Sequence, residues 1–178
     1  NIGGMIGNNS CGTHSVLYGK TIDHVLELSV VLSNGQRLVL GPVSDQKRAR
    51  KAAQDDLEGQ IYREIVRIAD ANEAEIKRRF PAVMRRVSGY NLDAFVESDR
   101  QLDLTKIVVG SEGTLCTTVE AKLNLERLPA HSAVVACHFD DLIEAMQANS
   151  EILETQPSAV ELVDKILLDQ TKGSIEFV

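Results

Sequence analysis

Residues 25–40, VLELSVVLSNGQRLVL, predict a β-hairpin. Two runs of aliphatic residues flank Asn34-Gly35, the dipeptide best suited to a type I′ turn. In the first run, aliphatic side chains alternate with the polar side chains of Glu27 and Ser29. The alternation places four aliphatic residues on one face: Leu26, Leu28, Val30 and Leu32. We therefore expect a sheet that is covered on one side.

Three further stretches extend this hairpin. Residues 57–80 repeat aliphatic residues at helical spacing and predict one long amphipathic helix that ends before Pro81. Residues 105–110 are typical of a buried strand. The alternation in residues 116–128, CTTVEAKLNLERL, predicts another strand with one apolar face: Val119, Ala121, Leu123 and Leu125. The prediction is a mainly antiparallel sheet packed against the 57–80 helix.

The pattern changes after Pro129. Strand-like residues 133–139 and 159–162 alternate with two helical stretches, the first of which Asp140 or Asp141 can cap. This β-α-β-α rhythm predicts an incomplete substrate or cap domain over residues 130–178. It follows a first domain over residues 1–129, and the predicted fold class is α+β.

Composition excludes several classes of protein. The 178 residues carry a net charge of -7, opposite in sign to the basic surface that nucleic-acid binding needs. Apolar runs are far shorter than the roughly 20 residues that span a bilayer, so no membrane span is expected. Cys11, Cys116 and Cys137 form no CxxC pair, which favours a reduced, cytoplasmic protein. Because the chain starts inside a glycine-rich stretch without Met, we expect a fragment of a longer protein.

Two glycine-rich segments are the candidate functional motifs: GGMIGNNSCGTH at residues 3–14 and GSEGTL at residues 110–115. Glycine lets backbone N–H groups converge and lets a ligand approach closely, which suits phosphates or planar cofactors and equally suits ordinary turns. We expect the first segment to be a loop with at most one helical turn. Neither segment fits the GxGxxG fingerprint or the GxxxxGK[ST] phosphate loop.

Three strings carry a family resemblance: GGMIGNNSCGTHSVLYGKTIDHVLELSVVLSNG, SGYNL and KIVVGSEGTLCTTVEAKLNLERLP. In this order they resemble the second half of the FAD-binding domain in FAD-linked oxidoreductases of the vanillyl-alcohol oxidase type. The resemblance covers about residues 1–129. Within that family the chain is most similar to bacterial D-2-hydroxyacid dehydrogenases, of D-2-hydroxyglutarate or of D-lactate and glycolate type. These include large forms fused to an iron–sulfur region.

The resemblance implies FAD as the cofactor, with any iron–sulfur cluster outside this chain. In this family FAD lies between two subdomains, and only the second is expected here, so the chain alone is not expected to hold FAD. The implied contacts are Gly4, Ile6, Asn8, Asn9, Ser10 and Gly12 in the first glycine segment, Val25 near the adenine end, and Glu112, Gly113 and Leu115 in the second segment. Cys11 and Cys116 stand where the family commonly has Gly.

SGYN at residues 88–91 stands where the family commonly has TGYD, with an Arg a few residues upstream. Arg85 or Arg86 fills that place. The resemblance implies that Arg85 and Ser88 bind the substrate carboxylate, since a guanidinium donates two parallel hydrogen bonds to a carboxylate. A pair of surface arginines is the alternative. The family's metal-binding and catalytic-base histidines belong to a C-terminal region outside this chain, so neither a catalytic residue nor a metal site is expected here.

The implied function is oxidation of a small D-2-hydroxyacid by hydride transfer from its α-carbon to the flavin, with the electron acceptor left open. Two alternatives remain. One is another FAD oxidase of the same fold that acts on a different alcohol or a sugar. The other is a non-catalytic interaction module that has lost the cofactor.

Overall fold

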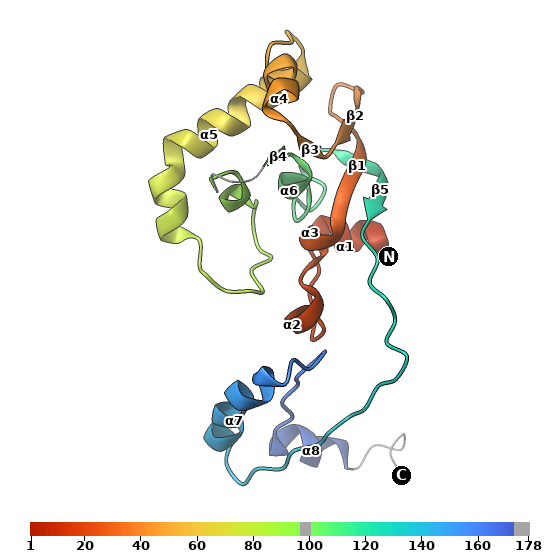
Figure 1. Cartoon of the computed structure of the whole chain (residues 1–178), viewed down its shortest axis with the longest axis vertical. Helices are drawn as coiled ribbons and strands as arrows, with labels where there is room; N and C mark the ends of the chain where they lie inside the picture. The colour runs from red at the N-terminus through yellow and green to blue at the C-terminus, as the bar shows by residue number, and fades with distance from the viewer. Residues whose placement is uncertain (97–100, 173–178) are drawn as a thin grey trace. The chain divides into compact units, whose positions relative to one another are not determined.

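A computed structural model describes residues 1–96 and 101–172 in two compact units (Figure 1). The larger unit comprises residues 1–11 and 19–125, and the smaller unit comprises residues 12–18 and 126–178. No helix within the described residues is long and apolar enough to cross a membrane.

An antiparallel three-stranded sheet organises the larger unit. It consists of β1 (Val25–Val31), β2 (Arg37–Leu40) and β5 (Thr117–Leu123), with β1 in the middle. The β1–β2 register pairs core residues with core residues, Leu28 with Leu40 and Val30 with Leu38. The predicted hairpin, the 116–128 strand and the α+β class are therefore confirmed.

The hairpin turn differs from the predicted type I′ turn. Only Gly35 has a positive φ, 82°, whereas a type I′ turn needs positive φ at Asn34 as well. The Leu32 carbonyl accepts from the Gly35 N–H at 2.9 Å, and the Leu32 N–H donates to the Gln36 carbonyl at 2.9 Å. The loop is thus one residue longer than predicted, with Gly35 in the left-handed position.

Two register shifts between β1 and β5 correct the predicted apolar faces. Leu26 is the extra residue on β1, between Val25 and Glu27, and Val119 is the extra residue on β5. Because side chains alternate along a strand, each bulge turns the extra residue outward. Leu26 is 44% exposed and Val119 is 59% exposed, although both were predicted to be inside, and Val25 is buried instead. Leu125, predicted on the same face, lies beyond the strand and is exposed.

The predicted 57–80 helix is confirmed as α5 (Leu57–Arg79), which follows α4 (Asp45–Ala52). Asp56 caps α5, because its Oδ1 accepts from the Gly59 N–H at 2.9 Å. α5 packs on α4 and on η1 (Leu92–Phe95), and α6 (Thr105–Val108) lies between η1 and β1 (Figure 1). η1 and α6 therefore lie between most of α5 and the sheet. Two α5 residues, Tyr62 and Ile65, belong to the same hydrophobic core as the sheet.

Residues 105–110 were predicted to be a strand, and this was wrong. They begin as α6, which follows the two-residue strand β4 (Leu102–Asp103), paired with β3 (Pro42–Val43). Asp103 Oδ1 accepts from both the Thr105 N–H, at 2.9 Å, and the Thr105 hydroxyl, at 2.7 Å. An Asp that bonds backbone two residues ahead starts a turn, so the apolar run leaves the extended conformation.

The smaller unit contains α2 (Ser15–Tyr18), α7 (Leu142–Glu154) and α8 (Lys165–Thr171). Asp141 caps α7 as predicted, with Oδ1 accepting from the Ile143 N–H at 2.6 Å. The predicted strands at residues 133–139 and 159–162 are not formed. In the described part of the chain no strand pairs with them, and a strand needs a neighbour for its backbone hydrogen bonds. Residues 173–178 of the predicted second domain lie outside the described residues.

Gly59→Ala is expected to destabilise the chain, although Ala favours a helix over Gly by about 1 kcal/mol. An ideal Cβ at Gly59 would lie 2.1 Å from the carbonyl oxygen of Gln54 and 3.0 Å from that of Lys51. Both are backbone atoms, so the α4–α5 connection has to shift. We expect a loss of about 1–3 kcal/mol in the free energy of unfolding, measured by urea denaturation.

Gln60→Ala is the matched control, because Gln60 is the exposed neighbour on the same helix. It is expected to leave stability unchanged or slightly raised. A Gly59→Ala chain as stable as wild type would show that the connection does not pack this closely.

Candidate functional site

The first glycine segment forms a helix, α1 (Ile2–Asn8), where a loop was predicted. Asn1 caps it, since its Oδ1 accepts from the Gly4 N–H at 2.8 Å. Ile6 is 2% exposed and anchors the helix in the core. The cap and this burial offset the entropic cost of the three glycines within the helix.

Asn9 ends α1 in the left-handed conformation, with φ 52° and ψ 52°. Its side chain is completely buried, and its Oδ1 accepts from the Ile22 N–H in α3 (Thr21–His24) at 3.0 Å. Its Nδ2 is buried with no partner among the described residues. The next carbonyl, of Ser10, accepts from both the N–H and the hydroxyl of Thr21. The end of α1 is therefore fixed to the start of α3.

The second glycine segment lies against the end of α1. The Gly110 N–H donates to the Ile6 carbonyl, and the Glu112 N–H donates to the Gly7 carbonyl, both at 2.9 Å. Gly110, Glu112 and Gly113 all have positive φ, of 87°, 54° and 74°. Two motifs that are distant in sequence thus form one hydrogen-bonded backbone surface.

The SGYNL segment completes this arrangement. Asn91 is 3% exposed, and its Nδ2 donates to the carbonyls of Lys106 at 3.1 Å and Val109 at 2.8 Å. The Tyr90 hydroxyl lies 2.8 Å from Thr114 Oγ1. We call the meeting point of the three segments the Gly110 junction; it comprises Ile6–Asn9, Asn91 and Gly110–Glu112.

Open space remains at the junction and beside it. An added Cβ at Gly7 or Gly113 would meet no atom within 4 Å, so both positions face open space. The apolar side chains of Met5 and Leu115 are 48% and 41% exposed. Exposed backbone together with exposed apolar side chains suits a large aromatic group such as a flavin ring.

The residues predicted to contact the cofactor fall into a buried group and an exposed group. Ile6, Asn9 and Val25 are buried, so their side chains act from within the core. Ser10 is half-buried, and five residues are exposed: Gly4, Asn8, Glu112, Gly113 and Leu115. Gly12 is exposed too, and it belongs to the smaller unit.

Cys116, which departs from the family pattern, is accommodated at the edge of the core. Its side chain is half-buried and packs against the core cluster. Burial raises the pKa of the Cys116 thiol, so the thiol stays protonated and weakly reactive at neutral pH.

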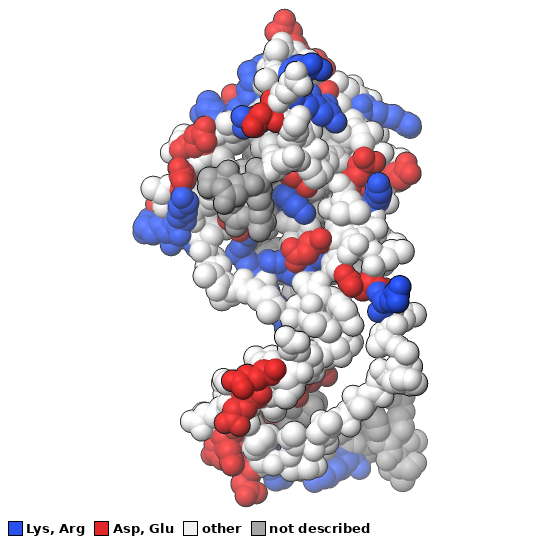
Figure 2. Space-filling view, viewed as in Figure 1, with Lys and Arg blue, Asp and Glu red and all other residues white. Residues whose placement is uncertain are grey.

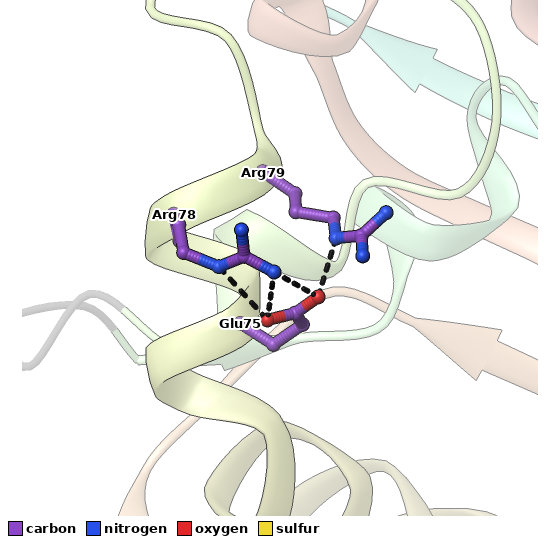
Figure 3. A network of polar contacts seen from close by, with 3 residues as sticks. All are labelled: Glu75, Arg78 and Arg79. Carbon is purple, nitrogen blue, oxygen red and sulfur yellow. Dashed lines mark hydrogen bonds and ion pairs between the residues drawn. The ribbon is translucent and has the colours of Figure 1, made fainter.

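Two arginines at the end of α5 share one carboxylate (Figure 3). Arg78 and Arg79 both donate to Glu75, and the Arg78 Nη2 lies 2.8 Å from Oε2. Both arginines are therefore engaged within their own helix.

Arg85 and Arg86 have different surroundings. Arg86 Nη2 donates to both carboxylate oxygens of Asp93 at 2.6 Å, and its guanidinium lies 4.7 Å from the centroid of the Phe80 ring. Its Nη1 is buried with no partner in the described part of the chain. Arg85 is exposed and has no ion pair with any described residue. Ser88 is exposed as well. Arg85 is thus the accessible guanidinium upstream of SGYN.

Sequence reasoning missed the role of Asn91. The SGYNL string was part of the resemblance, yet no pattern in it shows that the amide would be buried against two carbonyls. His14, in the smaller unit, lies 3.1 Å from the Ser158 carbonyl through Nδ1. Among the described residues, no group of three or more His, Cys, Asp or Glu side chains could hold a metal ion.

Gly110→Ala and Gly113→Ala should differ in cost, although both glycines are left-handed. The conformation alone costs about 1–2 kcal/mol at each. At Gly110 the new Cβ would also lie 3.3 Å from Asn9 Cβ and 3.5 Å from Asn91 Nδ2, whereas at Gly113 it meets open space. We expect Gly110→Ala to lose about 1 kcal/mol more in the free energy of unfolding, measured by urea denaturation. Equal losses would contradict close packing at the junction.

The chain is similar to known proteins in both its first and its last residues. Residues 1–41 match the FAD binding domain family, and residues 128–177 match the C-terminal domain of FAD linked oxidases. D-2-hydroxyglutarate dehydrogenase of Pantoea ananatis is 34% identical over 98% of this chain, and that of Pseudomonas putida is 32% identical over 94%. The glycolate oxidase subunit GlcD of Bacillus subtilis is 28% identical over 92% of this chain and is covered over 24% of its own length. The chain spans 17% of the length of the two dehydrogenases. It belongs to the FAD-linked oxidases and carries parts of both their FAD-binding and their C-terminal domains.

Proposed function

We propose that the chain forms part of an FAD-dependent dehydrogenase that oxidises a D-2-hydroxyacid, of D-2-hydroxyglutarate or of D-lactate and glycolate type. The observation that carries this proposal is the Gly110 junction, where backbone hydrogen bonds join the two glycine segments while Gly7 within it and Gly113 beside it face open space. The relatives named D-2-hydroxyglutarate dehydrogenase align with nearly the whole chain. A protein of the relatives' length that contains this chain is called the full-length enzyme below.

Exposed and half-buried residues at the junction and beside it are the ones that would touch FAD. We assign Gly4, Asn8 and Ser10 to direct contact, together with Glu112, Gly113 and Leu115, because all of them are at least partly exposed. Ile6, Asn9 and Val25 support this surface from within the core. When bound, FAD accepts the electron pair that leaves the α-carbon of the hydroxyacid.

Arg85 and Ser88 are assigned to the substrate carboxylate. Of the arginines near SGYN, Arg78, Arg79 and Arg86 already have acidic partners, which leaves the guanidinium of Arg85 to form two new bonds. A guanidinium matches a carboxylate in shape and charge, and the Ser88 hydroxyl adds one donor.

The remaining assignments concern domains and surroundings. We propose a division into residues 1–129 of the FAD-binding domain and 130–178 of the cap domain. All three cysteines are free, which favours the cytoplasm. Basic and acidic side chains are interspersed over the larger unit in Figure 2, which favours a small-molecule partner over nucleic acid.

The chain alone is expected not to retain FAD. A ligand of this size gains about 0.3 kcal/mol per heavy atom, so roughly fifty atoms supply about 15 kcal/mol. Losing half of these contacts leaves micromolar binding at best. Gel filtration of the chain after mixing with FAD, read by visible absorbance, checks this. A yellow chain with near-stoichiometric flavin would contradict it.

Arg85→Met in the full-length enzyme is expected to lower kcat/KM for D-2-hydroxyglutarate by about 10- to 150-fold, because a charge-assisted pair with the carboxylate is lost. Flavin content should stay unchanged. Steady-state kinetics and flavin absorbance on the same sample measure both.

Arg50→Met is the matched control, because Arg50 is an exposed arginine on α4, outside the site. It is expected to keep wild-type kinetics. Wild-type kcat/KM in the Arg85→Met enzyme for every 2-hydroxyacid turned over would show that Arg85 is only a surface residue.

A further inference from the structure

We propose that Asn91 is a positioning residue that fixes the GSEGTL turn, on which FAD rests, against the segment that carries Arg85 and Ser88. This inference rests on the proposed function. It concerns a buried side chain that touches neither ligand and acts through the backbone on both sides of it.

The first step concerns the two carbonyls that Asn91 binds. Lys106 and Val109 lie in the last turn of α6 and just after it, where carbonyls lack partners within the helix. Asn91 Nδ2 donates to both, at 3.1 Å and 2.8 Å, from a side chain that is 3% exposed. A buried carbonyl without a donor lowers the free energy of unfolding by about 1–3 kcal/mol, and the Asn91 amide avoids this loss.

The second step concerns the peptide unit between Val109 and Gly110. Its carbonyl oxygen accepts from Asn91, and its N–H donates to the Ile6 carbonyl at 2.9 Å. The peptide is planar, so bonds at its two ends restrict its orientation. Gly110 then turns the chain with φ 87° into the residues assigned to FAD.

The third step concerns the segment before Asn91. Ser88 is three residues upstream, and Gly89 has φ 74°, which bends the segment. The Tyr90 hydroxyl lies 2.8 Å from Thr114 Oγ1 and makes a second tie to the same turn. Tyr90 and Asn91 together therefore hold the segment that carries Arg85 and Ser88 against the GSEGTL turn.

In this chain the side chain at position 91 acts as a donor, because Asn91 Nδ2 faces two carbonyl oxygens. A carboxylate has no N–H and would face two carbonyl oxygens as a third acceptor. Asn91→Asp keeps the size of the side chain and removes both donors. It is therefore the sharpest single change.

The test uses the full-length enzyme, with FAD titrated into the apoprotein and followed by flavin fluorescence. Asn91→Asp is expected to weaken FAD binding about 10- to 100-fold and to raise the KM for D-2-hydroxyglutarate at saturating FAD. Asn72→Asp is the matched control, because Asn72 is an exposed residue of α5 whose Nδ2 donates to the Ile68 carbonyl at 2.8 Å. It should leave both constants unchanged.

Ile65→Ala, a substitution in the core on α5, distinguishes a positioning role of Asn91 from a general loss of stability. It should lower the Tm without weakening FAD binding. Unchanged FAD affinity in Asn91→Asp would overturn the proposal. So would a loss of affinity no larger than that of Ile65→Ala at equal Tm.

A second pair of variants keeps the proposal testable if Asn91→Asp does not fold. Tyr90→Phe and Thr114→Val each remove one hydroxyl from an exposed contact. Each should raise the KM, and the double variant should be no worse than the worse single variant. Additive or absent effects would overturn the second tie and, with it, the proposal. A wild-type enzyme that binds no FAD would instead refute the proposed function.

Discussion

The peptide between Val109 and Gly110 is the point on which the candidate site depends. Asn91 holds its oxygen, and Ile6 accepts from its N–H. Hydrogen bonds at both ends restrict the orientation of this planar unit, so the GSEGTL turn is held jointly by α1 and by SGYNL. Three motifs that are far apart in sequence thereby become one surface.

Two buried asparagines, Asn9 and Asn91, lie beside Gly110. A Cβ at Gly110 would lie 3.3 Å from Asn9 Cβ, which is closer than ordinary contact, and 3.5 Å from Asn91 Nδ2, which is an ordinary contact distance. Asn9 Nδ2 is buried with no partner among the described residues.

Local patterns predicted the elements whose signals are local. The Val25–Val31 strand, α5 and the Asp141 cap follow from alternation, helical spacing and capping chemistry. The bulges at Leu26 and Val119 did not, because a register shift depends on the partner strand. The glycine segments were recognised as a candidate site from composition and resemblance. Their joining through the Gly110 and Glu112 N–H groups was not predicted, and neither was the burial of the Asn91 amide against two carbonyls, since both are properties of the folded chain.

Anaerobic addition of D-2-hydroxyglutarate to the full-length enzyme tests the central claim most directly. The account predicts that the purified enzyme carries flavin and that its visible absorbance bleaches with the D-enantiomer, while the L-enantiomer leaves it unchanged. D-lactate and glycolate, added in the same way, define the substrate range. An enzyme without flavin, or flavin absorbance that none of these acids bleaches, would contradict the account.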